Sequence, residues 1–174
     1  MSRIRLLPTI GGLILTFIVL FGGYQIYRNF EVVQPLQVQL KQIHAVISAQ
    51  VVTVAQNPTV VVKLGKVDDL QATYTQIQNV IVNNLGNPIP ISIIDKRSAT
   101  LKTAYEQIKP ILFQGIAHGN YVSMISSFQK ACQLHHIQCK LSMNNQYIFV
   151  QVTQQNSYLY DVVPYSIKSS GVFS

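Results

Sequence analysis

The stretch Gln50–Gly86, QVVTVAQNPTVVVKLGKVDDLQATYTQIQNVIVNNLG, decides the fold class. Its first half holds two valine-rich runs, 50–55 and 59–64, separated by Gln-Asn-Pro, which predicts two strands in a hairpin. Asp68 and Gln71 then form a capping box at the start of a predicted helix, and a glycine ends it. The apolar face of this helix is Leu70, Tyr74, Ile77, Ile81 and Leu85.

Further elements are expected on both sides of this stretch. Pro35 suits the first turn of a helix. An apolar stripe follows it, made of Leu36, Leu40, Ile43 and Ile47. The stripe packs either on the domain or on a partner helix. Downstream, Ile89–Ile94 predicts a short strand, and a helix follows the turn at 95–98. We expect Pro110 to kink or end that helix, whose apolar face is Leu101, Tyr105, Ile108 and Leu112.

The last third of the chain predicts one more helix and three strands. The helix begins after Asn120, and its apolar face is Tyr121, Met124, Ile125, Phe128, Ala131 and Cys132. Strands are expected at 138–143, 146–153 and 158–163, the first two joined by Asn144-Asn145 in a tight turn. The resulting order, α-β-β-α-β-α-α-β-β-β, indicates an α+β fold. We expect one compact domain with a mixed β-sheet covered by helices.

An uncharged apolar run lies near the start of the chain. The 22 residues Leu6–Tyr27 carry no formal charge, and about 20 apolar residues suffice for a transmembrane helix. A cleaved signal peptide is the competing interpretation, but its apolar core would be shorter, about 7–15 residues, and Gly22–Tyr27 offers a poor cleavage site. The run therefore predicts an uncleaved membrane anchor.

The charges around this run predict its orientation. Arg3 and Arg5 precede it, whereas Arg28 beyond it is offset by Glu31, so the N-terminus should remain in the cytoplasm. The expected plan is a cytoplasmic tip at 1–5, a transmembrane helix at 6–26, a link and amphipathic helix at 27–49, an extracytoplasmic α+β domain at 50–164 and a flexible tail at 165–174. This plan locates the protein in the cell membrane, with the lipid bilayer as its first partner.

The net charge of +7 does not indicate a nucleic-acid-binding protein, because the basic residues are scattered and not gathered in a patch with aromatic residues. Amides dominate the polar residues. From Glu31 onward there are 18 Gln and 9 Asn against 16 charged residues. Because amides do not titrate, one hypothesis is that the domain faces an acidic or variable exterior. Compositional drift in a Gln-rich lineage is the alternative.

Two cysteines and two histidines lie within eight residues. Cys132, His135, His136 and Cys139 are ligand types that zinc prefers, but adjacent histidines on a helix point about 100° apart, and the spacing matches no known zinc knuckle. We therefore predict no metal site and no cofactor. Because an exported domain meets an oxidising compartment, a disulfide between Cys132 and Cys139 is one alternative, and two buried free thiols are the other.

The sequence does not predict an enzyme. It has six acidic residues, of which Asp68, Asp69 and Asp95 suit helix starts or turns. It has no nucleophile elbow, P-loop or dinucleotide-binding motif. His44 and His118 each stand alone in the sequence. Only a convergence of His118 with an acid and a hydroxyl would indicate catalysis.

The segment Ile43–Leu85 is similar to known envelope modules. QIHAVISAQVVTVAQNPTVVVKL followed by VDDLQATYTQIQNVIVNNLG gives the order helix, hairpin, helix, which resembles ring-building and BON-like modules that assemble side by side at membranes. The overall layout also resembles inner-membrane assembly proteins of pilus and secretion systems, and exported proteins of Gram-positive bacteria. The resemblance implies assembly in the envelope and carries over no functional residue.

The expected function is a non-enzymatic interaction or assembly role in the bacterial envelope, with protein partners or a second copy of the chain. The alternative is a module that binds or senses a small molecule or wall component. That alternative would require a pocket lined by Tyr105, Tyr121, Tyr158 or Tyr160.

Overall fold

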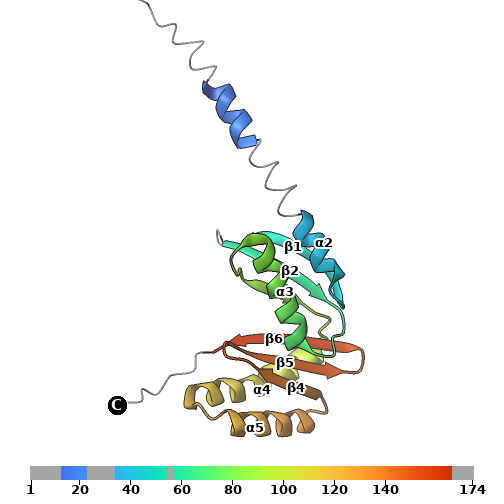
Figure 1. Ribbon diagram of the computed structural model, residues 1–174. Helices are drawn as coiled ribbons and strands as arrows, with labels where there is room; N and C mark the ends of the chain where they lie inside the picture. The colour runs from blue at the N-terminus through green and yellow to red at the C-terminus, as the bar shows by residue number, and fades with distance from the viewer. Residues whose placement is uncertain (1–12, 23–33, 55–56, 166–174) are drawn as a thin grey trace, which may run out of the picture.

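The structure, a computed structural model, describes residues 13–22, 34–54 and 57–165 (Figure 1). Residues 13–22 are helical. The later elements are α2 (Gln34–Gln42), β1 (Val46–Val54), β2 (Asn57–Leu64), α3 (Leu70–Leu85), β3 (Ile91–Ile94), α4 (Ala99–His118), α5 (Tyr121–Leu134), β4 (Gln138–Met143), β5 (Tyr147–Gln154) and β6 (Ser157–Pro164). Their order and the α+β class agree with the sequence prediction.

The strands form two sheets where one was predicted, and only the first of them is mixed. β1 pairs antiparallel with β2, and β2 pairs parallel with β3, whereas β4, β5 and β6 form a separate antiparallel sheet. β3 has only four residues, and the chain after it meets β6 through a single bridge between Lys96 and Tyr158. This isolated bridge does not extend the ladder from β3 into the second sheet.

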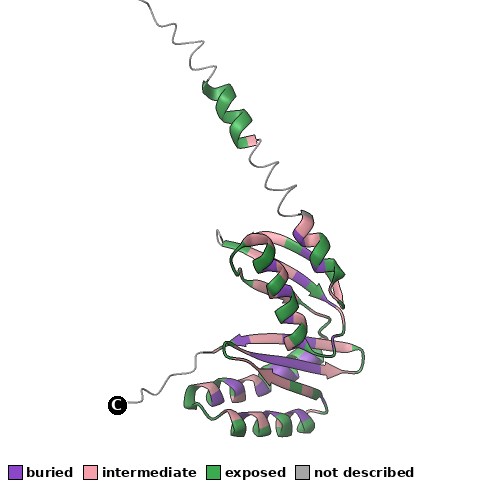
Figure 2. Cartoon of the chain, in the orientation of Figure 1, coloured by how far each residue is buried: buried purple, intermediate pink, exposed green. Residues whose placement is uncertain are grey.

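The second sheet is covered on both faces. Successive side chains of a strand point to opposite faces. Ile148, Val150 and Val152 of β5 accordingly pack with α4 and α5, while Phe149 between them packs with α3 and the first sheet. Figure 2 shows buried residues along the strands between α3 and α4. The second sheet thus lies between the layer of α4 and α5 and the layer of α3 and the first sheet.

Two polar side chains tie the second sheet to the segment before α3. The Tyr160 hydroxyl accepts from the Val67 backbone N–H at 2.9 Å and donates to the Gly65 carbonyl at 3.0 Å. Gln151, a buried polar residue, accepts from the Leu70 N–H at 2.8 Å and donates to the Val67 carbonyl at 3.0 Å. These bonds satisfy buried backbone groups that precede the helix.

The first helix of this region is shorter than the apolar stripe predicted. α2 ends at Gln42, and β1 begins at Val46, so Ile43 lies in the turn and Ile47 on the strand. Leu36 and Leu40 are fully buried, as expected, but Ile47 is 55% exposed. A spacing of four also fits two elements joined by a turn, and the β-branched residues from Val46 onward favour a strand.

Helix α3 begins one residue later than its capping box predicted. The cap is Asp69, not Asp68, and its carboxylate accepts from the Ala72 N–H at 2.9 Å. Leu70, Tyr74, Ile77 and Ile81 are buried as predicted, and Gly86 ends the helix in the left-handed conformation, φ 75°. Both α2 and α3 pack with the buried face of the first sheet.

Helix α4 continues through Pro110, so this proline does not end the helix as one of the two predicted alternatives required. It runs for 20 residues from its Ser98 cap to His118. Pro110 is exposed, so its ring points away from the core. α5 follows after two residues, and Gly115 of α4 is buried where the Met124 side chain of α5 rests against it.

Of the predicted transmembrane helix, residues 6–26, the structure describes 13–22, which are helical. The rest of the predicted helix lies outside the described residues. In the described parts of the chain, no helix is both long and apolar enough to cross a membrane. The predicted tip at 1–5 and all of the tail except Tyr165 also lie outside the described residues.

Candidate functional site

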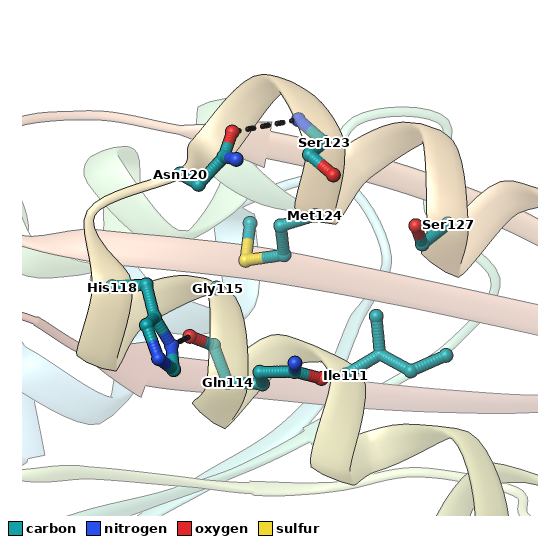
Figure 3. A pocket seen from close by; sticks show the side chains of 8 residues that line it. All are labelled: Ile111, Gln114, Gly115, His118, Asn120, Ser123, Met124 and Ser127. Atoms are coloured by element: carbon teal, nitrogen blue, oxygen red, sulfur yellow. Dashed lines mark hydrogen bonds between the residues drawn. The ribbon is translucent and has the colours of Figure 1, made fainter.

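A pocket of about 360 Å³ opens between α4 and α5, near the turn that joins them (Figure 3). Its residues are Ile111, Gln114, Gly115, His118, Asn120, Ser123, Met124 and Ser127. The Met124 side chain lies between the two helices, and the imidazole, amides and hydroxyls surround it. The pocket therefore combines an apolar floor with uncharged hydrogen-bonding groups, a composition typical of small-molecule sites.

Local helix-end chemistry positions the polar groups of this pocket. Nδ1 of His118 lies 2.8 Å from the Gln114 carbonyl, one turn earlier on α4. A neutral imidazole must donate in this contact, which leaves Nε2 as an acceptor. The Asn120 carbonyl oxygen caps α5 by accepting from the Ser123 N–H at 3.2 Å. The His118 and Asn120 side chains are exposed, and each is oriented by its hydrogen bond to a backbone group.

The pocket brings together two of the three groups that catalysis would require. His118 shares it with the hydroxyls of Ser123 and Ser127, but none of the eight lining residues is acidic. A histidine acting as general base on a hydroxyl is normally oriented by a third group, and here the Gln114 carbonyl holds the ring. The arrangement is better suited to hydrogen bonding with a ligand than to acyl transfer.

A second polar cluster lies where α4 meets β6. The Asp161 carboxylate accepts from the Tyr105 hydroxyl at 2.7 Å and pairs with Lys109 Nζ at 2.9 Å. The Lys109 ammonium also lies over the Tyr105 and Phe113 rings, at 5.5 and 5.7 Å from their centroids. Burial, followed by the nearby Asp161 charge, raises the pKa of Tyr105 far above its ordinary value. This phenol therefore stays protonated and structural.

The adjoining turn holds another carboxylate in place. Asp95 receives two bonds from Arg97, both 2.6 Å, and one from the Tyr160 backbone N–H at 2.8 Å. The Asp95 side chain is 1% exposed. The Asp95 hydrogen bond and its charge raise the pKa of Arg97. Both the Asp95 and the Asp161 carboxylates are thus engaged in joining the β3–α4 segment to β6.

The four tyrosines predicted to line a ligand pocket do not converge on one. Tyr105 and Tyr160 are buried, and each hydroxyl is already hydrogen-bonded. Tyr158 stacks on Tyr160 with 5.4 Å between ring centroids. Tyr121 meets Tyr165 edge to face, also at 5.4 Å. These rings fill space between elements.

The cysteine–histidine cluster divides into a covalent link and two separate imidazoles. Cys132 of α5 and Cys139 of β4 form a disulfide, with their Cα atoms 6.2 Å apart. Their sulfurs are therefore not thiolates available to a metal. His135 ends α5 and His136 follows it with φ 53°. Among the described residues, no group of three or more His, Cys, Asp or Glu could hold a metal ion.

Sequence reasoning named parts of the pocket without predicting it. Asn120 was predicted to precede a helix, and His118 was interpreted as a residue standing alone. The sequence patterns do not predict that α4 and α5 approach each other closely and antiparallel. Gly115 permits this approach, which encloses the space beside His118. His44, the other solitary histidine, lines a more open depression between α2 and α3.

No protein-family model matches this chain, and neither does any of the curated proteins or solved structures with which it was compared.

Proposed function

We propose that the chain is a membrane-anchored, extracytoplasmic protein with a non-enzymatic interaction or assembly role in the bacterial envelope. The anchor is the segment 6–26 of the uncharged run Leu6–Tyr27, with Arg3 and Arg5 retaining the N-terminus in the cytoplasm. The disulfide supports an oxidising compartment for the folded domain, because such bonds are rare in the cytosol.

The open face of the first sheet is the observation that carries the interaction role. α2 and α3 both pack on the opposite face, and none of the described elements packs on this one. Ile47 and Ile94 are 55% and 47% exposed on it, and Val61 between them is half-buried. Apolar residues presented on a sheet face with a polar surround are typical of protein contact surfaces.

Site-specific crosslinking in the membrane tests this role. A photoreactive amino acid at Ile94, on the open face, is expected to capture a discrete protein band that mass spectrometry then identifies. The same amino acid at Gln107, exposed on α4, is the matched control and should capture none. Recovery of the monomer alone from both positions would contradict the interaction role.

A separate experiment tests the anchor. The protein is expected to stay in the membrane pellet after alkaline carbonate extraction. Leu15→Arg with Ile18→Arg should release it, because each arginine at the centre of a transmembrane helix costs about 2.5–3.5 kcal/mol. Val122→Arg with Leu134→Arg, at two exposed apolar positions of α5, is the matched control and should leave it in the pellet. Extraction of the unaltered protein would refute the anchor.

Protease treatment of cells whose outer layers have been removed then tests the orientation. The domain should be digested while the membrane remains intact, since the charge pattern predicts that it lies outside. Protection of the domain until the membrane is dissolved would show the opposite orientation.

The pocket between α4 and α5 favours a second candidate function, the binding of a small molecule or wall component. Soluble peptidoglycan fragments can serve as the probe. Binding at this pocket should shift the NMR resonances of His118 and Ser123, and Met124→Gln, which places an amide in the pocket floor, should weaken it. Resonances that stay unchanged at millimolar fragment would exclude this ligand class.

A further inference from the structure

The two sheets have four edge strands, β1, β3, β4 and β6, which differ in how they are protected. An edge strand presents unpaired backbone N–H and C=O groups that can template pairing with another chain. Proteins usually prevent this with short strands, prolines, charged residues or covering segments.

Edge strand β6 is the one most completely covered. Its Tyr158 N–H donates to the Lys96 carbonyl at 3.0 Å, and its Tyr160 N–H donates to the Asp95 carboxylate at 2.8 Å. The strand ends at Pro164. The segment after β3 therefore occupies two of the N–H groups that a new strand would need.

Edge strands β3 and β4 are protected in simpler ways. β3 has four residues and directly follows Pro90, so it offers little length for pairing. β4 has six residues and carries Lys140, which bonds the Asp68 carbonyl at 2.9 Å and pairs with Asp69 at 3.6 Å. A charged side chain in a short edge strand disfavours pairing with a second chain.

Among the described residues, edge strand β1 shows none of these features along most of its length. It spans nine residues, VISAQVVTV, without a proline or a charged residue. Its only irregularity lies between Val46 and Ser48, and from Ser48 to Val54 its register with β2 is regular. In Figure 1, β1 forms the margin of the first sheet that is farther from β4–β6. Thus the longest edge strand is also the least protected.

We propose that β1 pairs antiparallel with β1 of a second copy of this chain, across a two-fold axis near Gln50, the middle residue of the strand. This inference rests on the proposed assembly role and names a second copy as one partner, at an edge separate from the open face of the sheet. An uncharged strand meets its own copy without repulsion. Antiparallel pairing about such an axis also places the buried face of one sheet in line with that of the other, so the two three-stranded sheets become one of six strands.

Two further features favour a second copy of the chain as the partner of β1. Val38 is 57% exposed on α2, the helix that packs with the buried face beside β1, and the pairing brings the α2 helices of both copies to the same face. The assembly also closes at two copies. An isologous contact consumes both β1 edges, and β3, β4 and β6 remain protected, so no fibre can grow from it.

Cysteine crosslinking of the full chain in detergent solution tests the pairing directly. Gln50→Cys is expected to give a covalent dimer with a short bismaleimide, because the two copies of residue 50 lie side by side at the axis. Cys132 and Cys139 do not react, since they are bonded to each other. Gln107→Cys, exposed on α4, is the matched control and should remain monomeric.

Charge substitutions at the same position provide the second arm. Gln50→Lys and Gln50→Glu should each weaken the dimer, by up to about fivefold in sedimentation velocity, because like charges then face each other. An equimolar mixture of the two variants should recover the dimer, which a misfolded variant would not do. Gln107→Lys should have no effect.

The outcomes separate this inference from the proposed function. A monomer at Gln50→Cys, or a dimer insensitive to the Gln50 charges, overturns the β1 pairing. If crosslinking at Ile94 nevertheless captures a different protein, the interaction role stands without the second copy. If crosslinking at Ile94 also captures nothing, both the β1 pairing and the interaction role are refuted.

Discussion

Gly115 is the residue on which the contact between α4 and α5 depends. A Cβ atom added there would overlap the Met124 side chain (Figure 3). Gly115→Ala should therefore destabilise the fold by about 1–3 kcal/mol, the usual cost of overpacking, although alanine favours a helix more than glycine does. Urea unfolding followed by circular dichroism measures this loss.

Combining that substitution with Met124→Ala identifies the cause. Each single variant should lose stability, but the double variant should lose clearly less than the sum, because the smaller side chain at 124 makes room for the new methyl group. Strict additivity of the two losses would show that the steric argument is wrong.

The Tyr160 hydroxyl is expected to matter for stability. Tyr160→Phe leaves the Val67 N–H and the Gly65 carbonyl without this partner and should cost about 1–3 kcal/mol in unfolding free energy. Tyr158→Phe is the control, since the Tyr158 hydroxyl has no hydrogen bond in the described structure. Equal losses in the two variants would contradict this role.

At the level of single elements, periodicity predicted most of what the structure contains. The strands at 138–143 and 158–163 and the buried face of α3 follow directly from alternating or helical spacing. The errors occur where two patterns coincide. Ile47 fits both the apolar stripe of a helix and a strand of β-branched residues. Asp68 and Asp69 are equally good helix caps by local sequence, and the choice of Asp69 follows from the burial of Leu70 as the first residue of α3.

Pro110 does not end α4, because a proline inside a helix costs stability without necessarily breaking it. Packing of Leu101, Ile108 and Leu112 holds α4 together on both sides of it. Pro110→Ala should therefore stabilise the protein by about 1–2 kcal/mol, since it restores the backbone donor to the Glu106 carbonyl and the Pro110 side chain is exposed.

Thermal unfolding checks this, with Gln107→Ala as the control on the same helix, where a change below about 0.5 kcal/mol is expected. A decrease in stability on replacing Pro110 would mean that its restriction of the unfolded chain outweighs the missing bond.

The disulfide joins the end of α5 to β4 across a separation of seven residues. Closing a loop of this size should contribute about 2–3 kcal/mol. Cys132→Ala with Cys139→Ala should lower the melting temperature, and reductant should lower that of the unaltered protein only. If reductant had no effect on the unaltered protein, the bond would be absent or without influence on stability.

For the whole molecule, the sequence predicted the class but not the number of sheets. Which strands pair is decided by contacts between residues distant in sequence, such as Tyr160 with Val67 and Gln151 with Leu70. Local sequence patterns do not encode these contacts. The pocket beside His118 was missed for the same reason, because it exists only once α4 and α5 approach each other.

The scarcity of carboxylates should determine how the protein responds to acid. The chain has six Asp and Glu, and its many amides do not titrate. Hydrogen bonding from the Ala72 N–H, with help from the Lys140 charge, lowers the pKa of Asp69 below its ordinary 3.8. A carboxyl group whose pKa is lowered by folding stabilises the fold above its unfolded pKa and loses that contribution as the pH falls through its folded pKa.

The stabilisation from Asp69 should therefore be complete above about pH 5 and lost only below about pH 4, which predicts nearly constant stability between pH 6 and pH 4. Urea midpoints measured at each pH check this. Asp69→Asn keeps an amide oxygen that can cap α3 but cannot titrate, so its decline below pH 4 should be shallower. A midpoint that collapses between pH 6 and pH 4 would contradict the prediction. It would also refute the hypothesis that the amide-rich composition suits an acidic exterior, because the fold would then fail where Asp69 is still ionised.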